Sequence, residues 1–220
     1  TGLVEQAGAD VEAATYHVDN KARVERLSEW ITILKRLWTE DDVTHEGTHY
    51  RFAHVTVEPK PAAKPRPPIW IANNAVGSRE VIERTHRRVV RHADGWQTSL
   101  SDPADVAWRL ENIRALAREM GRDPDTIATH LYHNINVNAD QEAAVAESKR
   151  FLDLYYTPTE FAREEVLSWV ATGSPEQCVA HLKEYERIGF DEVALRITAW
   201  DQMGQLKRVM DEVLPHFPVR

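Results

Sequence analysis

The residues with the clearest chemical pattern lie between a short apolar run and an expected helix. Ile69–Ala72 has the composition of a strand buried on both faces, and a helix is expected from about Arg79 to His92. Asn73-Asn74-Ala75-Val76-Gly77-Ser78 stands between them. A helix amino terminus presents unpaired backbone N–H groups and the positive end of the helix dipole, which together favour an anion. This segment is therefore a candidate anion site at the carboxyl end of a strand.

The side chains of this segment suit a phosphate. Gly77 permits close approach of the ligand, Ser78 offers a hydroxyl and Arg79 offers a positive charge. The amides of Asn73 and Asn74 can bond either cofactor oxygens or the loop itself. A plain helix cap is the alternative interpretation, because Asn, Gly and Ser are ordinary turn residues.

Polar residues near the ends of other apolar runs are further candidates. Active sites of α/β barrels lie at the carboxyl ends of the strands. On that rule we expect a substrate pocket to be lined by Thr98, Ser99, Asn134 and Arg196. The alternation of Asn134 with apolar neighbours equally fits one solvated face of a short strand. No catalytic residue can be assigned from the sequence.

Metal and nucleophile chemistry find little support. His45, His49 and His54 are close in sequence but lack a matching carboxylate or cysteine set, so we expect surface histidines and no metal. Cys178 is the single cysteine, which excludes an intramolecular disulfide and suggests a reducing, cytoplasmic setting. No Walker-type loop, G-x-S-x-G elbow or G-x-G-x-x-G fingerprint is present.

The elements that must position these residues alternate between strand and helix. After a helix from about Arg23 to Trp38 and a hairpin over Thr44–Val57, the chain repeats strand and helix four times. We expect these four strands: Ile69–Ala72, Gly95–Thr98, Leu131–Val137 and Val193–Thr198. A long helical region is expected from about Gln141 to Val170. This order predicts parallel strands with helices packed outside.

Length then limits the architecture. A complete barrel usually needs about 250 residues, and the chain has 220. We therefore predict one domain over residues 1–220, the carboxyl-terminal half of a TIM-type (β/α)8 barrel of the α/β class, with about four βα units and a small β-hairpin insertion. Because the chain begins at Thr1, it is expected to be a processed product or a fragment.

Charge and hydropathy argue against two classes of binding partner, nucleic acids and membranes. A formal net charge of −8 argues against nucleic-acid binding. No stretch approaches the roughly 18 apolar residues that span a bilayer, so no membrane association is expected.

Several segments resemble the bacterial luciferase-like superfamily of flavin- and deazaflavin-dependent enzymes. The resemblance runs from about residue 20 to 217, and its motifs follow in the order typical of the family. They are Arg23–Leu27 with Leu37-Trp38, Glu46-Gly47 with Tyr50, Glu58–Pro61 with Pro67–Ile71, Ala93–Trp96, Gly173–Glu176 with Leu182 and Gly189–Asp191, and Val213–Pro215.

The resemblance implies a cofactor and a reaction. In this family the loop at Gly77 and Ser78 contacts the flavin phosphate, although many members have glycines where Asn73 and Asn74 stand. It implies a flavin-dependent oxidoreductase, a monooxygenase using reduced FMN and oxygen on a small organic substrate, commonly with a flavin reductase as partner. The alternative is hydride transfer with the deazaflavin coenzyme F420. A third reading is an incomplete half-barrel that pairs with itself or with a missing amino-terminal half, because open edge strands need cover.

Overall fold

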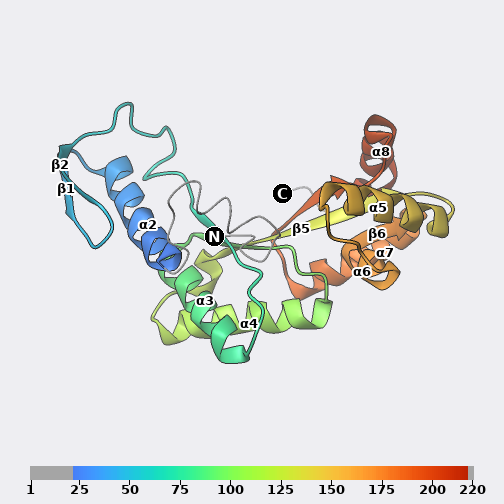
Figure 1. The fold of residues 1–220 in the computed structure, drawn as a ribbon, viewed down its shortest axis with the longest axis horizontal. Helices are drawn as coiled ribbons and strands as arrows, with labels where there is room; N and C mark the ends of the chain where they lie inside the picture. The colour runs from blue at the N-terminus through green and yellow to red at the C-terminus, as the bar shows by residue number, and fades with distance from the viewer. Residues whose placement is uncertain (1–21, 218–220) are drawn as a thin grey trace. The chain divides into compact units, whose positions relative to one another are not determined.

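The computed structural model describes residues 22–217, which form two compact units. Unit 1 comprises residues 22–96 and 113–128, and unit 2 comprises residues 97–112 and 129–217. Three elements belong partly to each unit (Figure 1): β4 (Gly95–Thr98), α4 (Pro103–Glu119) and β5 (Ala128–Val137).

Unit 1 begins with a helix and the predicted hairpin. The helix α2 (Arg23–Thr39) buries Ile31 and Ile33, and β1 (Val43–Glu46) pairs antiparallel with β2 (Arg51–Val55). The Glu29 carboxylate accepts hydrogen bonds from the backbone N–H groups of His49 and Tyr50, each at 3.0 Å. These bonds fix the hairpin turn to the helix.

The predicted strand–loop–helix unit follows. It consists of β3 (Trp70–Ala72) and α3 (Arg79–His92), and the helix bounds are those expected. The backbone N–H of Asp94 donates to the carbonyl of Ile69 at 2.7 Å, which sets β4 beside β3 at their starts. A Cβ added to Gly95 would lie 2.5 Å from the Trp70 ring, so the position tolerates no side chain without movement of that ring. The short helical turn η1 (Pro124–Thr126) completes the unit.

An ion pair between Arg66 and Asp94 fixes the segment that leads into β3. The Arg66 guanidinium donates to both oxygens of Asp94, at 2.6 and 3.0 Å, and the Ile69 N–H donates to the same carboxylate at 2.7 Å. Burial raises the pKa of Asp94, but these donors outweigh burial and hold the pKa below its usual value. The carboxylate thus stabilises the fold in its charged form.

Replacing Asp94 with asparagine is expected to lower the free energy of unfolding by about 1.5–3 kcal/mol, because hydrogen bonds to a charged group are lost and Arg66 keeps an uncompensated charge. Urea denaturation followed by circular dichroism measures the change. Asp125→Asn, at an exposed position of η1 in the same unit, is the control. Equal effects of the two substitutions would show that the Arg66 pair contributes nothing.

Unit 2 is organised around a parallel sheet. The central strand β5 pairs with β6 (Val170–Gly173) in the register Asn134↔Val170, and with β7 (Glu192–Ile197) in the register Asn134↔Arg196. The strands predicted at Leu131–Val137 and Val193–Thr198 are confirmed with shifts of up to three residues at their ends.

Helices flank this sheet. They are α5 (Gln141–Tyr155), α6 (Arg163–Trp169), α7 (Pro175–Ile188) and α8 (Gln202–Arg208), followed by the turns η2 (Val209–Val213) and η3 (Leu214–His216). The main buried cluster joins β5 to α7 and η2, and consists of Ile135, Val137, Ala171, Cys178, Leu182, Val209 and Val213. The Cys178 thiol is buried, and burial raises its pKa to about 12. It packs as a small apolar side chain.

The helical region expected over Gln141–Val170 is wrong in one respect. The helix ends at Tyr155, and α6 resumes at Arg163 after a connection that contains Pro158. Proline lacks the backbone N–H that a helix interior requires, which accounts for an interruption here. Val170–Gly173 then forms β6, a short strand whose pairing with β5 no local pattern announces.

None of the described helices is both long and apolar enough to cross a bilayer.

Candidate functional site

The loop from Asn73 to Arg79 leaves β3 and opens α3, as predicted, within unit 1. Ser78 is the N-cap residue, and its Oγ accepts a hydrogen bond from the Val81 N–H at 3.4 Å. Gly77 has φ +123°, a conformation that favours glycine, and the nearest atoms to an added Cβ belong to Val81 at 3.7 Å. Asn74, Gly77, Ser78 and Arg79 are exposed. This rim is open to a ligand.

Asn73 differs from its neighbours because it is buried. Its Oδ1 accepts from the Ala75 N–H at 3.0 Å, and its Nδ2 donates to Thr85 Oγ1 at 2.7 Å. Of the two roles left open by the sequence, these bonds give the amide the second one: it shapes the loop and ties it to α3.

Glu80 places an exposed carboxylate in the first turn of α3. The Ser78 hydroxyl donates to the Glu80 carboxylate, and the backbone N–H of Glu80 does the same, so both hold the pKa of this carboxyl below its usual value. The side chain is exposed and can therefore move away. The residues present fit a phosphate, with Glu80 as an internal competitor.

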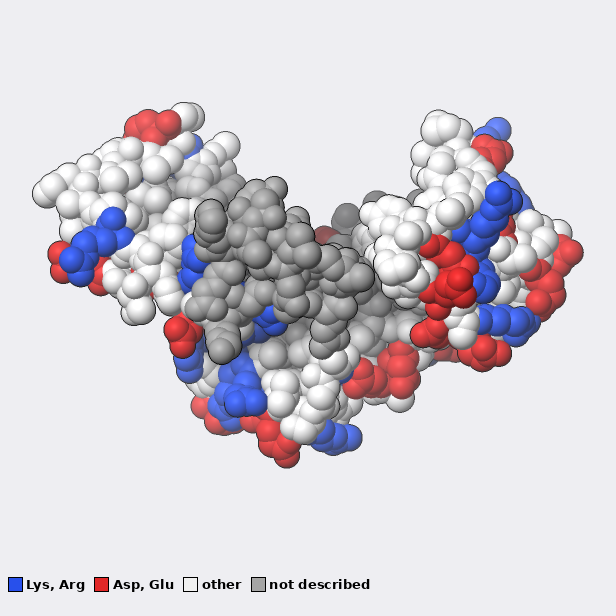
Figure 2. Space-filling model, viewed as in Figure 1, with Lys and Arg blue, Asp and Glu red and all other residues white. Residues whose placement is uncertain are grey.

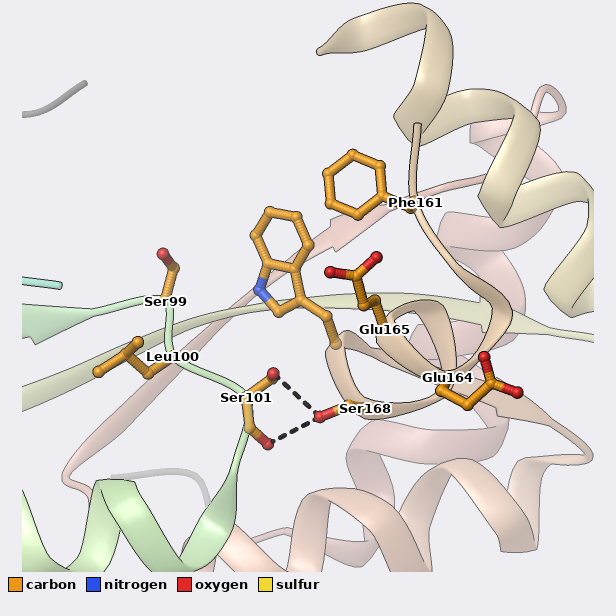
Figure 3. Close-up of a pocket in the computed structure, with 8 residues that line it drawn as sticks. Ser99, Leu100, Ser101, Phe161, Glu164, Glu165 and Ser168 are labelled. Carbon is orange, nitrogen blue, oxygen red and sulfur yellow. Dashed lines mark hydrogen bonds between the residues drawn. The ribbon is translucent and has the colours of Figure 1, made fainter. Parts of the chain in front are cut away.

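A separate pocket of about 400 Å³ lies within unit 2. Figure 3 shows its residues, which come from the segment after β4 and from the α6 region: Ser99, Leu100, Ser101, Phe161, Glu164, Glu165, Ser168 and Trp169. The Ser168 hydroxyl donates to the Ser101 hydroxyl at 2.9 Å and joins the two sides. The two sides of this pocket are therefore formed by segments that are more than sixty residues apart in the sequence.

The predicted substrate residues have distinct places in unit 2. Ser99 lines the pocket. Thr98 is buried, and its Oγ1 accepts from the Leu100 N–H at 3.3 Å, so it shapes the segment that leads to the pocket. Asn134 is buried and Arg196 half-buried. The Arg196 Nε donates to Asn134 Oδ1 at 2.9 Å, which brings these two together on adjacent strands.

The interpretation of Asn134 as one of a solvated strand face is wrong, because the side chain is fully buried. Its Nδ2 donates to the Trp169 carbonyl at 3.0 Å. The loop belongs to unit 1 and these residues belong to unit 2.

Sequence reasoning missed most of the pocket wall. Glu164 and Glu165 are exposed and line the pocket, and no motif in the sequence marked them. Phe161 and Trp169 fell inside the region expected to be one long helix. The aromatic spacing around Pro158 was the signal that could have suggested a break with a ring-lined surface.

The hairpin histidines have carboxylate neighbours. His45 Nε2 lies 2.9 Å from Glu29, and His54 Nδ1 lies 2.8 Å from Asp42. Within residues 22–217 no group of three or more His, Cys, Asp or Glu side chains is placed to hold a metal ion. On the face drawn in Figure 2, basic and acidic side chains are interspersed in both units.

Comparison with known proteins gives a consistent result. A family model described as luciferase-like monooxygenase matches residues 2–192. The oxygenase component of the flavin-dependent trigonelline monooxygenase of Acinetobacter baylyi is 23% identical, over 88% of this chain and 60% of that protein. An F420-dependent glucose-6-phosphate dehydrogenase of Intrasporangium calvum is 24% identical, over 89% of this chain and 61% of that protein. The chain therefore spans about three fifths of the length of these relatives.

Solved structures show the same fold. The monooxygenase RslO1 from Streptomyces bottropensis superposes with a TM-score of 0.75 at 20% identity, covering 94% of this chain and 65% of that chain. The coenzyme F420 dependent tetrahydromethanopterin reductase from Methanopyrus kandleri gives 0.74 at 15% identity, covering 89% and 64%. The predicted partial α/β barrel is confirmed. Since the family model also covers most of the sequence, the chain belongs to the luciferase-like monooxygenase family.

Proposed function

We propose that the Asn73–Arg79 loop binds the phosphate end of a flavin-type cofactor, and that the protein is a flavin-dependent oxidoreductase acting on a small organic molecule. The observation that carries this proposal is the geometry of the loop: Ser78 is the N-cap of α3, Gly77 has φ +123°, and both residues are exposed at the helix amino terminus. Family membership supports it, because similar proteins are named as flavin-dependent or F420-dependent enzymes.

Each residue of the loop has a separate part in this proposal. Ser78 and the first N–H groups of α3 hold the phosphate oxygens, and Gly77 leaves room for their approach. Arg79 adds a positive charge, and Asn74 offers an exposed amide. Asn73 is a positioning residue that keeps the loop in shape. When bound, reduced FMN would supply electrons for oxygenation, whereas F420 would supply a hydride.

FMN is favoured as the cofactor and F420 is the alternative. An FMNH(2)-dependent dimethylsulfone monooxygenase of Pseudomonas putida is 27% identical over 57% of this chain, which supports FMN. Fluorescence titration of the purified chain with FMN and with F420 distinguishes them. Saturable binding of one cofactor supports the corresponding reaction class, and binding of neither would contradict the proposal.

Two substitutions at the first turn of α3 should change phosphate affinity in opposite directions. Ser78→Ala removes a donor to a charged group, so FMN affinity is expected to fall about tenfold. Glu80→Gln removes the competing charge near the helix amino terminus, so affinity is expected to rise roughly threefold. Both are measured by the same titration, with inorganic phosphate as competitor.

Glu83→Gln, one turn further along α3, is the matched control and should leave affinity unchanged. Thermal melting checks that Ser78→Ala keeps its fold, since an N-cap contributes about 1 kcal/mol. A loss of affinity in all three variants, or in none, would separate the loop from the cofactor.

We further propose that a flavin reductase is a partner of this protein. We also propose that the open edge of the sheet in unit 2 is covered by additional polypeptide. In unit 2, β7 pairs with β5, and no second strand of that unit's described residues pairs with β7. A second copy, or further strands that complete the barrel, would satisfy such an edge. Light scattering on the purified chain tests self-association. If the chain is a monomer with full oxygenase activity, neither a second copy nor further strands are needed. That result would also contradict the interpretation of the chain as an incomplete half-barrel.

A further inference from the structure

We infer that Arg196 and the adjoining pocket of unit 2 form a subsite for an anionic group, a carboxylate or sulfonate, on a substrate with an apolar body. The inference rests on the proposed function, because it names the substrate class of that enzyme. It stands on different residues from the cofactor loop.

The Arg196 guanidinium is held by neutral side chains, Tyr132 among them, and has donor capacity left. Its Nε donates to Asn134 Oδ1 at 2.9 Å, and its Nη1 donates to the Tyr156 hydroxyl at 3.2 Å. Its Nη2 is buried and has no hydrogen-bond partner among residues 22–217. These partners are neutral, and no carboxylate of the described residues forms an ion pair with it. The positive charge is therefore oriented but not neutralised.

Five aromatic rings surround this charge. Their centroids lie 4.6–5.8 Å from the guanidinium carbon, and they belong to Tyr132, Phe151, Tyr155, Tyr156 and Trp169. Ring faces attract the cation and exclude water, which strengthens its interaction with any anion that enters. The nearest ring is that of Tyr155, whose residue is 64% exposed. Tyr155 is thus a cover that can swing outward without disturbing the core.

Trp169 connects this charge to the pocket. Its ring borders Arg196 at 5.8 Å, and the same residue lines the 400 Å³ cavity. Its Nε1 is likewise buried with no hydrogen-bond partner in the described part of the chain. Two neighbouring donors lack acceptors, and buried donors are normally satisfied in native structures. A ligand that brings oxygen acceptors supplies what both groups lack, whereas a cation does not.

The remaining lining residues restrict the ligand. Glu164 and Glu165 are exposed carboxylates on the pocket wall, so they repel negative charge along that wall and restrict an anionic group to the side that faces Arg196. The neighbouring cation Arg163 is paired with Glu142 and leaves their charge in place. Phe161 offers an apolar surface opposite the serine hydroxyls (Figure 3). These features favour a single anionic group attached to an apolar or aromatic body.

Benzoate titration of the full chain tests the inference, with benzyl alcohol as the neutral analogue of similar size. The readout is the indole N–H signal of Trp169 in a ¹H–¹⁵N spectrum, assigned with Trp169→Phe. Benzoate is expected to shift this signal saturably, and to bind at least tenfold more tightly than benzyl alcohol. Equal affinity for the two compounds would overturn the inference, since the charge would then play no part.

Variants assign the effect to one residue. Arg196→Met should abolish the preference for benzoate, whereas Arg163→Met removes an equal charge near the same pocket and should preserve it. Should Arg196→Met fail to fold, Arg196→Lys keeps the charge but lacks the fork, and is expected to retain only part of the preference. Tyr155→Ala should leave binding intact or strengthen it. Unchanged binding in both Arg196 variants would mean that Arg196 serves packing alone.

The cofactor loop is tested separately. Ser78→Ala is expected to leave benzoate binding unaltered, and Arg196→Met to leave FMN titration unaltered. Benzoate binding without flavin binding would therefore contradict the proposed function and spare this inference. Flavin binding without a charge-dependent benzoate signal would do the reverse.

Discussion

Replacing Ile135 with alanine is expected to lower the free energy of unfolding by about 2–5 kcal/mol, the usual cost of emptying a packed core position. Ile135 is fully buried in β5 and packs with the cluster formed by α7 and η2. Its strand is hydrogen-bonded on both sides, to Ala171 of β6 and Ile197 of β7 in register. Because the backbone is held from both sides, it cannot collapse into the cavity, and the cost should lie in the upper half of that range.

Chemical denaturation followed by tryptophan fluorescence measures this loss. Met203→Ala is the control, because Met203 is 74% exposed on α8 and a surface substitution usually changes stability by less than about 0.5 kcal/mol. A change below about 1 kcal/mol for Ile135→Ala, on the scale of single methylene losses, would mean that this cluster is not the main core of unit 2.

Acidification is expected to destabilise the protein through a buried histidine pair. His133 Nε2 lies 2.8 Å from His181 Nε2, and burial, together with the neighbouring histidine, lowers the pKa of His133 to about 3. Burial also lowers the pKa of His181. The unfolded chain takes up these protons near pH 6.5, whereas the folded chain resists them. The stabilising contribution is therefore complete above pH 6.5 and is lost as the pH falls toward 3.

The size of this effect follows from the shift. At pH 5 a single such histidine costs roughly 2 kcal/mol, because each pH unit below 6.5 costs about 1.4 kcal/mol. Urea titrations at several pH values between about 7 and about 5.5 measure the onset of this loss, above the pH range in which carboxylates take up most of their protons. His133→Gln keeps a polar group near His181 without titrating, and should flatten the curve.

Met203→Ala provides the comparison, because Met203 is 74% exposed and carries no titratable group. It should leave the pH dependence as it is. If His133→Gln and the parent chain respond to acid with the same slope, the buried pair is not the source of the instability.

Local sequence rules succeeded where the determining interactions are local. The helix over Arg79–His92 and its Ser78 cap depend on residues within one turn, and both were predictable. By contrast, β6 exists because Val170–Gly173 meets β5 from more than thirty residues earlier. A run of four residues such as Val-Ala-Thr-Gly is too short to distinguish helix from strand, and only the pairing partner decides.

The candidate sites divide in the same way. The open rim of the loop at Gly77 could be anticipated from residue types, since glycine and serine at a helix start have few roles. The burial of Asn73 and its hydrogen bond to α3 could not be anticipated, because its partner Thr85 lies 12 residues further along the sequence. The rings around Arg196 come from β5, α5 and α6, so no spacing in the sequence marks them as one cluster. Their identity as a site depends on the tertiary fold alone.

The carboxylate of Glu80 has a kinetic consequence for the proposed cofactor. In the proposed function, a phosphate that binds the first turn of α3 competes with the Glu80 carboxylate beside Ser78. This competition would shorten the residence time of the bound phosphate group. A short residence time suits a flavin that binds and dissociates in every catalytic cycle. Under the proposed function, the flavin is a cosubstrate that dissociates after each turnover and is reduced again by a second enzyme. Buffers rich in phosphate are therefore expected to slow turnover.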